Sequence, residues 1–180
     1  MARTRQDPLE LLRKIQQRSI ETAPGLPQEQ QAAKLWSGVA FRLADLKLVV
    51  RLDEVVEVLP CPAYTVVPGT KSWIKGVANV RGNLITIVDL AEYFGKPPVH
   101  LDERARLVVM NAPSLHAGLL VHEVLGLRHF DEDNERQQLP ELDDPVMAHL
   151  TGAFVREEVL WGVFDMKSLA ESATFKHVAA

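Results

Sequence analysis

Two apolar runs joined by a short polar connection constrain the fold of this chain more than any other feature. The runs cover residues 73–78 and 84–90, and Asn79-Val80-Arg81-Gly82 lies at the start of the connection. A glycine after the arginine suits a tight turn, because glycine adopts positive φ angles without a steric penalty. Two buried runs that reverse direction over so few residues predict a β-hairpin.

Composition and charge exclude several classes of function. The chain has 180 residues, 47% of them apolar, which is enough for one domain with a hydrophobic core. Its net charge is −4, and no Lys/Arg cluster with interleaved aromatics is present, so nucleic acid is not an expected partner. The single cysteine, Cys61, rules out an intrachain disulfide. With no apolar run of about 20 residues and no signal-peptide pattern, we expect a cytoplasmic protein that does not insert into a membrane.

The remaining pattern is that of an all-β protein with minor helices. Apolar and other residues alternate over Val39–Leu43 and again over Leu48–Leu52, which predicts a second hairpin. Short strand-like segments then recur at intervals typical of barrels and sandwiches. They cover residues 84–90, 106–110, 119–124 with an extension to 130, 150–157 and 159–164. A final helix follows, with Asp165 as its cap.

Three regions are expected along the chain. Residues 1–34 form an N-terminal helix and linker, with the helix over about 8–21 and Asp7 and Pro8 at its start. Residues 35–172 form the main domain, and residues 173–180 form a C-terminal tail. Residues 131–144 are strongly polar and acidic, and they lack the glycine and the terminal glutamate of a calcium-binding loop.

Several segments in order resemble the CheW family of chemotaxis adaptors. The Asn79–Gly82 stretch corresponds to the family's "N-L-R-G" turn, and Trp73–Val77 matches the run that leads to it. Val55-Val56-Glu57-Val58 corresponds to the family's "V-x-E-I" segment. Ile87-Val88-Asp89-Leu90 corresponds to "P-V-I-D-L", although Thr86 stands where the family usually has proline. The resemblance covers about residues 35–172.

This resemblance implies a fold and a function. The implied fold is a pair of five-stranded, SH3-like β-barrels that lie side by side with a groove between them. The implied function is a non-catalytic adaptor that binds the cytoplasmic tip of a chemoreceptor and the regulatory domain of a CheA-type histidine kinase. The separate N-terminal helix is similar to the PilI branch of the family, which serves twitching motility through type IV pili.

The resemblance also implies a partner-binding site around Arg81. The planar guanidinium of arginine binds a carboxylate through two parallel hydrogen bonds, and Glu57 is its expected partner within the chain. At a period of two, Val55 shares a face with Glu57, and we expect that face to be exposed to a receptor helix. Asn79, Val80 and Gly82 complete the expected site.

No catalytic, metal or cofactor site is expected. The six histidines lack the close spacing of metal ligands, and no nucleophile or phosphate-binding motif is present. Cys61 has no evident base beside it in the sequence, and Trp36, Trp73 and Trp161 suit core or interface positions better than a ligand cage. Two alternatives to the adaptor remain open, namely a small-molecule-binding β-barrel and a structural subunit that self-assembles through a sheet edge.

Overall fold

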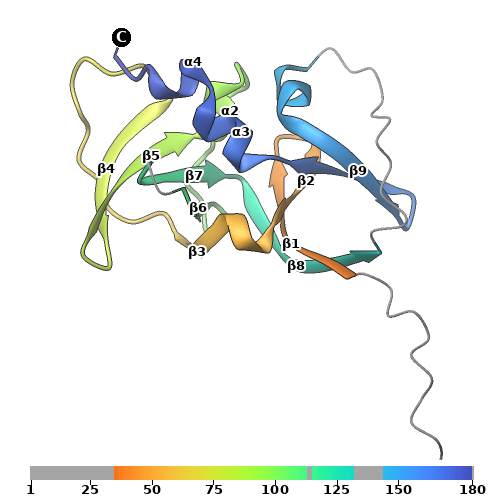
Figure 1. Cartoon of the computed structure of the whole chain (residues 1–180). Coiled ribbons are helices and arrows are strands. Elements are labelled where there is room, and N and C mark those ends of the chain that lie inside the picture. Colours follow the sequence, from red (N-terminus) through yellow and green to blue (C-terminus); the bar gives the residue numbers. More distant parts are fainter. Residues whose placement is uncertain (1–34, 113–114, 132–143, 180) are drawn as a thin grey trace, which may run out of the picture. The chain divides into compact units, whose positions relative to one another are not determined.

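The computed structural model describes residues 35–112, 115–131 and 144–179, which belong to the unit Ala33–Ala180 of the chain. This part folds into two five-stranded sheets (Figure 1). The prediction of an all-β fold with two five-stranded units is confirmed. The helix expected over residues 8–21 and most of the expected acidic loop lie outside the described residues.

The first sheet takes strands from both ends of this unit and the second from its middle. In spatial order the first sheet contains β8 (Glu123–Asp131), β1 (Leu35–Leu43), β2 (Leu46–Arg51), β10 (Val159–Phe164) and β9 (Leu150–Arg156). The second contains β3 (Val55–Pro60), β6 (Arg106–Met110), β7 (Ala117–Val121), β5 (Asn83–Asp89) and β4 (Ile74–Val80). The short helices are η1 (Leu52–Glu54), α2 (Leu90–Tyr93), η3 (Pro145–His149), α3 (Met166–Glu171) and α4 (Ala173–Lys176).

Three hairpins close through turns that contain non-glycine residues with positive φ. These residues are Ala44 between β1 and β2, Arg81 between β4 and β5, and both Glu157 and Glu158 between β9 and β10. Positive φ at such turns matches the right-handed twist of the flanking strands. The predicted hairpins are therefore confirmed. Each sheet also contains one parallel pair of strands, β2 with β10 and β5 with β7.

The strand expected over residues 119–124, with its extension to 130, is two strands in two different sheets. All side chains of β7 are buried in the second sheet, whereas β8 begins at Glu123 and pairs with β1 of the first sheet. His122 lies at the crossing, and its Nδ1 accepts a hydrogen bond from the backbone N–H of Ala44 at 3.2 Å. The polar pair at 122–123 therefore marks the passage between sheets.

The core consists of two apolar clusters. The larger one spans the second sheet and one face of the first, with Phe41 of β1 in edge contact with Phe164 of β10. The smaller one lies within the first sheet and contains Trp36, Phe154 and Trp161. All three tryptophans of the sequence are buried, as expected for core residues.

Glu54 ties the connection between the sheets to the C-terminal helices. Only 5% of this residue is exposed, and its Oε2 accepts a hydrogen bond from the backbone N–H of Met166 at 3.0 Å. Lys167 Nζ lies 3.9 Å from its other carboxylate oxygen. Burial raises the pKa of Glu54 above its ordinary value of 4.5, against the opposing effect of the Met166 hydrogen bond.

Glu54→Gln is expected to alter the pH dependence of stability. Because the folded-state pKa is raised, the folded protein binds more protons than the unfolded chain, so the Glu54 contribution weakens as pH rises through 4.5 and the folded pKa. Glutamine keeps an oxygen acceptor for Met166 but does not titrate. Unfolding free energies of both proteins, measured by urea denaturation across this pH range, should show the variant gaining on the wild type toward neutrality. A constant difference would contradict the assignment.

The C-terminal residues pack onto the second sheet. Phe175 of α4 is buried, and its ring stacks on Trp73 at a centroid distance of 5.9 Å and meets Tyr93 edge-on at 5.3 Å. The backbone N–H of Lys71 donates to the carbonyl of Val178 at 3.0 Å. The segment expected as a tail, residues 173–180, thus contributes a core side chain in its described part.

Candidate functional site

The tip of the β4–β5 hairpin presents Arg81 to solvent. Val80 pairs with Asn83, so Arg81 and Gly82 alone form the loop, with φ angles of 49° and 88°. Asn79 Oδ1 accepts a hydrogen bond from the backbone N–H of Gly82 at 2.8 Å. A side chain with a Cβ atom occupies this left-handed region at a cost of about 1–2 kcal/mol, which glycine and asparagine largely avoid. The turn therefore carries an arginine at a position whose conformation does not favour one.

Glu57 of β3 holds the guanidinium in place. Arg81 Nε lies 2.9 Å from Glu57 Oε2, and the Arg81 side chain is 82% exposed whereas that of Glu57 is 19% exposed. The ion pair expected from the sequence is thus present. A pair with one partner so exposed contributes only about 0–1 kcal/mol to stability, so its main effect is on the orientation of Arg81. Guanidinium has five N–H donors, and one contact at Nε does not satisfy them all.

A shallow apolar hollow lies beside this ion pair. Its volume is about 140 Å³, and it is lined by Val56, Glu57, Val80, Asn83, Ile85, Val109, Met110 and His116. Val56 is 60% exposed at the hollow, whereas Leu84, which pairs with Asn79 and is 65% exposed, lies on the other face of β5 from Asn83 and Ile85. Together Val56, Glu57 and Arg81 form what we call the Arg81 surface.

One of the expected site residues, Val55, does not lie on the face where the sequence placed it. Val55 shares a face with Glu57, as expected, but that face packs against the core, and Val56 and Val58 are the exposed side chains of β3. A bulge between Val55 and Glu57 interrupts the pairing of β3 with β6 at this point. Val80 is also buried and reaches the site only as a wall of the hollow. The prediction of Val55 as an exposed contact is wrong.

Sequence reasoning missed the far wall of the hollow. Val109, Met110 and His116 come from β6 and the segment before β7, and no local motif marks them. They reach the site because β3 is the edge strand next to β6. Only the strand order, which periodicity does not determine, brings them beside Glu57.

In the part of the chain that the structure describes, the histidines and Cys61 do not gather into a metal site. Within the described residues, no three side chains of His, Cys, Asp or Glu are placed to bind a metal ion. Burial lowers the pKa of His122 and of His149, which lie on different segments, and raises the pKa of the Cys61 thiol. Every helix in the described part of the chain is too short or too polar to cross a membrane.

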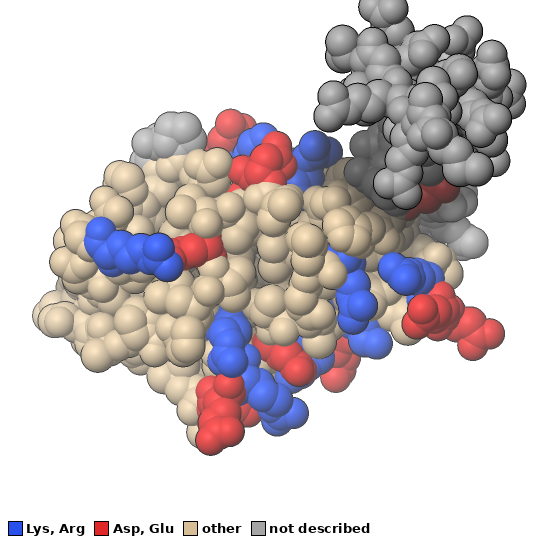
Figure 2. All heavy atoms as spheres, turned by 90° about the horizontal axis from the view of Figure 1, so that it is seen from below, with Lys and Arg blue, Asp and Glu red and all other residues tan. Residues whose placement is uncertain are grey.

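Charge is dispersed over the face of the molecule seen in Figure 2. Figure 2 shows Lys and Arg side chains beside Asp and Glu on one face, with broad uncharged areas between them. No extended area of a single sign, such as nucleic-acid binding requires, is visible on that face.

Comparisons with known proteins agree with this fold. The family description "CheW-like domain" matches residues 37–174. The chain is 42% identical to the protein PilI of Pseudomonas aeruginosa over 174 residues, which cover 97% of each chain. It is 36% identical to the protein FrzA of Myxococcus xanthus over 106 residues, or 59% of this chain and 66% of FrzA. The crystal structure of the scaffolding protein TtCheW from Thermoanaerobacter tengcongensis has the same fold, with a TM-score of 0.68 at 24% identity, covering 77% of this chain and 94% of that one.

Proposed function

This chain belongs to the CheW-like domain family, whose members are non-catalytic scaffold proteins, and from that premise we propose that it couples a chemoreceptor to a CheA-type histidine kinase. The resemblance inferred from the sequence, including the similarity to PilI, is confirmed. In the proposed role the chain works in the cytoplasm, at the membrane face that carries the receptor. Its similarity to PilI over nearly the whole chain supports a role in a chemosensory system for type IV pilus twitching motility.

The observation that carries the proposal is the exposed Arg81, oriented by Glu57 at 2.9 Å on a two-residue turn. An arginine in this backbone conformation contributes little to folding, so its presence there is better explained by binding. The receptor tip is helical in the proposed complex. An acidic residue of that helix pairs with the guanidinium, and apolar residues one turn away contact Val56 and the hollow beside it.

Replacing Arg81 separates binding from folding. Arg81→Ala and Arg81→Asn both remove the guanidinium, and we expect each to weaken receptor coupling by at least about tenfold, as for a central interface residue. Asparagine tolerates the left-handed conformation, so Arg81→Asn should be more stable to urea than Arg81→Ala by about 1 kcal/mol. Receptor-dependent kinase autophosphorylation, reconstituted with the CheA-type kinase of the same organism, measures the coupling.

Arg104→Ala is the matched control, because Arg104 is also an exposed arginine with a carboxylate partner, Asp102, at 3.3 Å. This variant should couple normally. If the Arg81 variants couple as well as Arg104→Ala does, the role of Arg81 is confined to the β4–β5 turn and does not include receptor binding. If the wild type binds neither receptor nor kinase in a pull-down, the adaptor function itself is excluded.

A further inference from the structure

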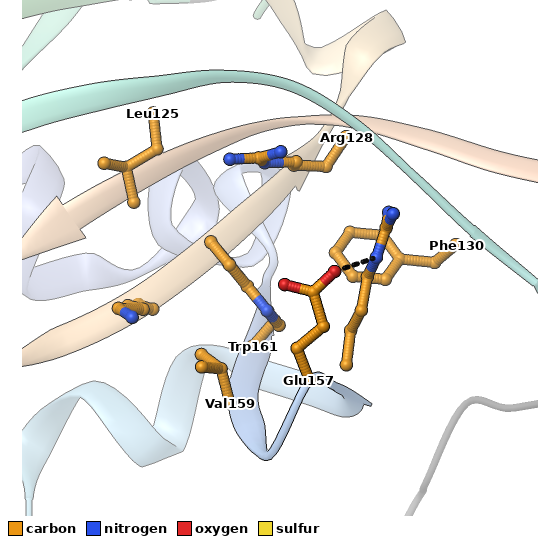
Figure 3. Close-up of a pocket in the computed structure, with 8 residues that line it drawn as sticks. Leu125, Arg128, Phe130, Glu157, Val159 and Trp161 are labelled. Atoms are coloured by element: carbon orange, nitrogen blue, oxygen red, sulfur yellow. Dashed lines mark ion pairs between the residues drawn. The ribbon is translucent and has the colours of Figure 1, made fainter.

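A second hollow opens at the first sheet, away from the strands that carry the Arg81 surface. It has a volume of about 250 Å³ and is lined by Lys47, Leu125, Arg128, Phe130, Arg156, Glu157, Val159 and Trp161. Figure 3 shows the labelled side chains converging on one space from β8, β10 and the turn before β10. Phe130 and Trp161 belong to the smaller core cluster, so the floor of the hollow is the core itself.

Two cations face the same indole ring. Lys47 Nζ lies 5.7 Å and Arg128 Cζ 5.8 Å from the centroid of Trp161, both within range of a cation–π interaction. Arg156 has a carboxylate partner, Glu157, at 3.7 Å. Within the described residues, no carboxylate lies at ion-pair distance from Lys47 or Arg128. Among the residues that the structure describes, the lining of the hollow therefore has an excess of positive charge, on a protein whose net charge is −4.

The size of the hollow limits its occupant. Sites for small molecules and cofactors enclose roughly 300–1,000 Å³, and this one is smaller and open. Such a space suits one or two apolar side chains of a polypeptide whose backbone remains outside. Carboxylates beside those side chains would then reach Lys47 and Arg128 at the rim, where charge complementarity selects a partner.

We propose that this hollow is a second docking site, which takes an acidic and apolar segment of a partner protein. The segment places a large apolar side chain against Trp161 and Phe130 and an Asp or Glu at Lys47 and Arg128. This site is independent of the Arg81 surface, since it uses residues of the other sheet. The proposal does not depend on which partner the Arg81 surface binds.

Selection from a library of random dodecapeptides displayed on phage tests the proposal without a presumed ligand. Peptides selected on the wild-type protein should carry an Asp or Glu within two residues of Leu, Ile, Phe or Trp. The double variant Lys47→Glu with Arg128→Glu should bind the selected peptides at least about tenfold more weakly than the wild type does. Added salt should also weaken the binding of these peptides to the wild type. Both side chains are exposed, so the double variant should retain its fold, which its circular dichroism verifies.

Lys71→Glu is the matched control, because Lys71 Nζ lies 6.0 Å from the ring of Trp73, outside the hollow. It should bind the selected peptides as the wild type does. Peptides without acidic residues, or equal binding to the double variant, would overturn the proposal. Benzoate provides the small-molecule comparison: if it shifts the Trp161 indole N–H resonance while no peptide is selected, the hollow is a small-anion site instead.

Discussion

Gly76→Ala is expected to lower the free energy of unfolding by about 3 kcal/mol or more, because it combines backbone strain with a steric clash. Gly76 has a φ of 149°, and a Cβ atom at this position would lie 2.2 Å from the carbonyl oxygen of Thr65. That carbonyl is held in place, since Thr65 and Val77 exchange two backbone hydrogen bonds of 2.8 and 2.9 Å. The Thr65 carbonyl therefore cannot move away from the added Cβ atom without disturbing these hydrogen bonds.

Gly95→Ala isolates the strain from the clash. Gly95 also has a positive φ, 71°, but nothing lies within 4 Å of a Cβ atom placed there. We expect it to cost only about 1 kcal/mol. Urea denaturation followed by circular dichroism compares the two variants. Equal losses of stability would show that the segment around Thr65 moves aside easily, and that β4 does not depend on this close approach.

Phe175→Ala should destabilise the protein by about 3–5 kcal/mol, the usual cost of deleting a buried phenylalanine. Only 2% of Phe175 is exposed, and its ring contacts both Trp73 and Tyr93. The emission of Trp73 should also shift to longer wavelength as water reaches its indole. Phe175 lies just beyond residues 37–174, the part matched by the family description, so this chain extends its core past that part.

Val178→Ala is the control for Phe175. Val178 belongs to the same segment but is 40% exposed, so its truncation should cost far less than that of Phe175, about 0.5 kcal/mol. Fluorescence of both variants in the folded state and urea denaturation provide the measurements. If Phe175→Ala is as mild as Val178→Ala, the C-terminal helices rest on the sheet without stabilising it.

The parts of the site that local chemistry specifies were predictable from the sequence. A glycine beside Arg81 between two apolar runs indicates the turn, and the family resemblance brings Glu57 to it. Period two placed Val55 and Glu57 on one face but did not say which face is buried. The sequence suggests that the face of Val56 and Val58 is buried, since both are apolar and Glu57 is not. At the edge strand β3, however, that face is exposed, and the Glu57 carboxylate lies at the rim beside Arg81.

Features that depend on long-range pairing were not predictable. The residues from 119 to 130 read as one strand because nothing in their alternation signals the passage between sheets at His122. The hollow at Trp161 was missed for the same reason. Lys47, Arg128 and Trp161 belong to three strands that are far apart in the sequence, and they meet only because β2, β8 and β10 belong to one sheet.

The strands of the first sheet come from two separate parts of the chain, and this sets an order for folding during synthesis. Every strand of the second sheet lies between residues 55 and 121, so that sheet has all its strands once this stretch has left the ribosome. The strands β1 and β2 emerge earlier, but their pairing partners β8 and β10 are made only after the second sheet. A ribosome that stalls after residue 121 therefore leaves an apolar hairpin with both edges unpaired, a species that chaperones are suited to hold.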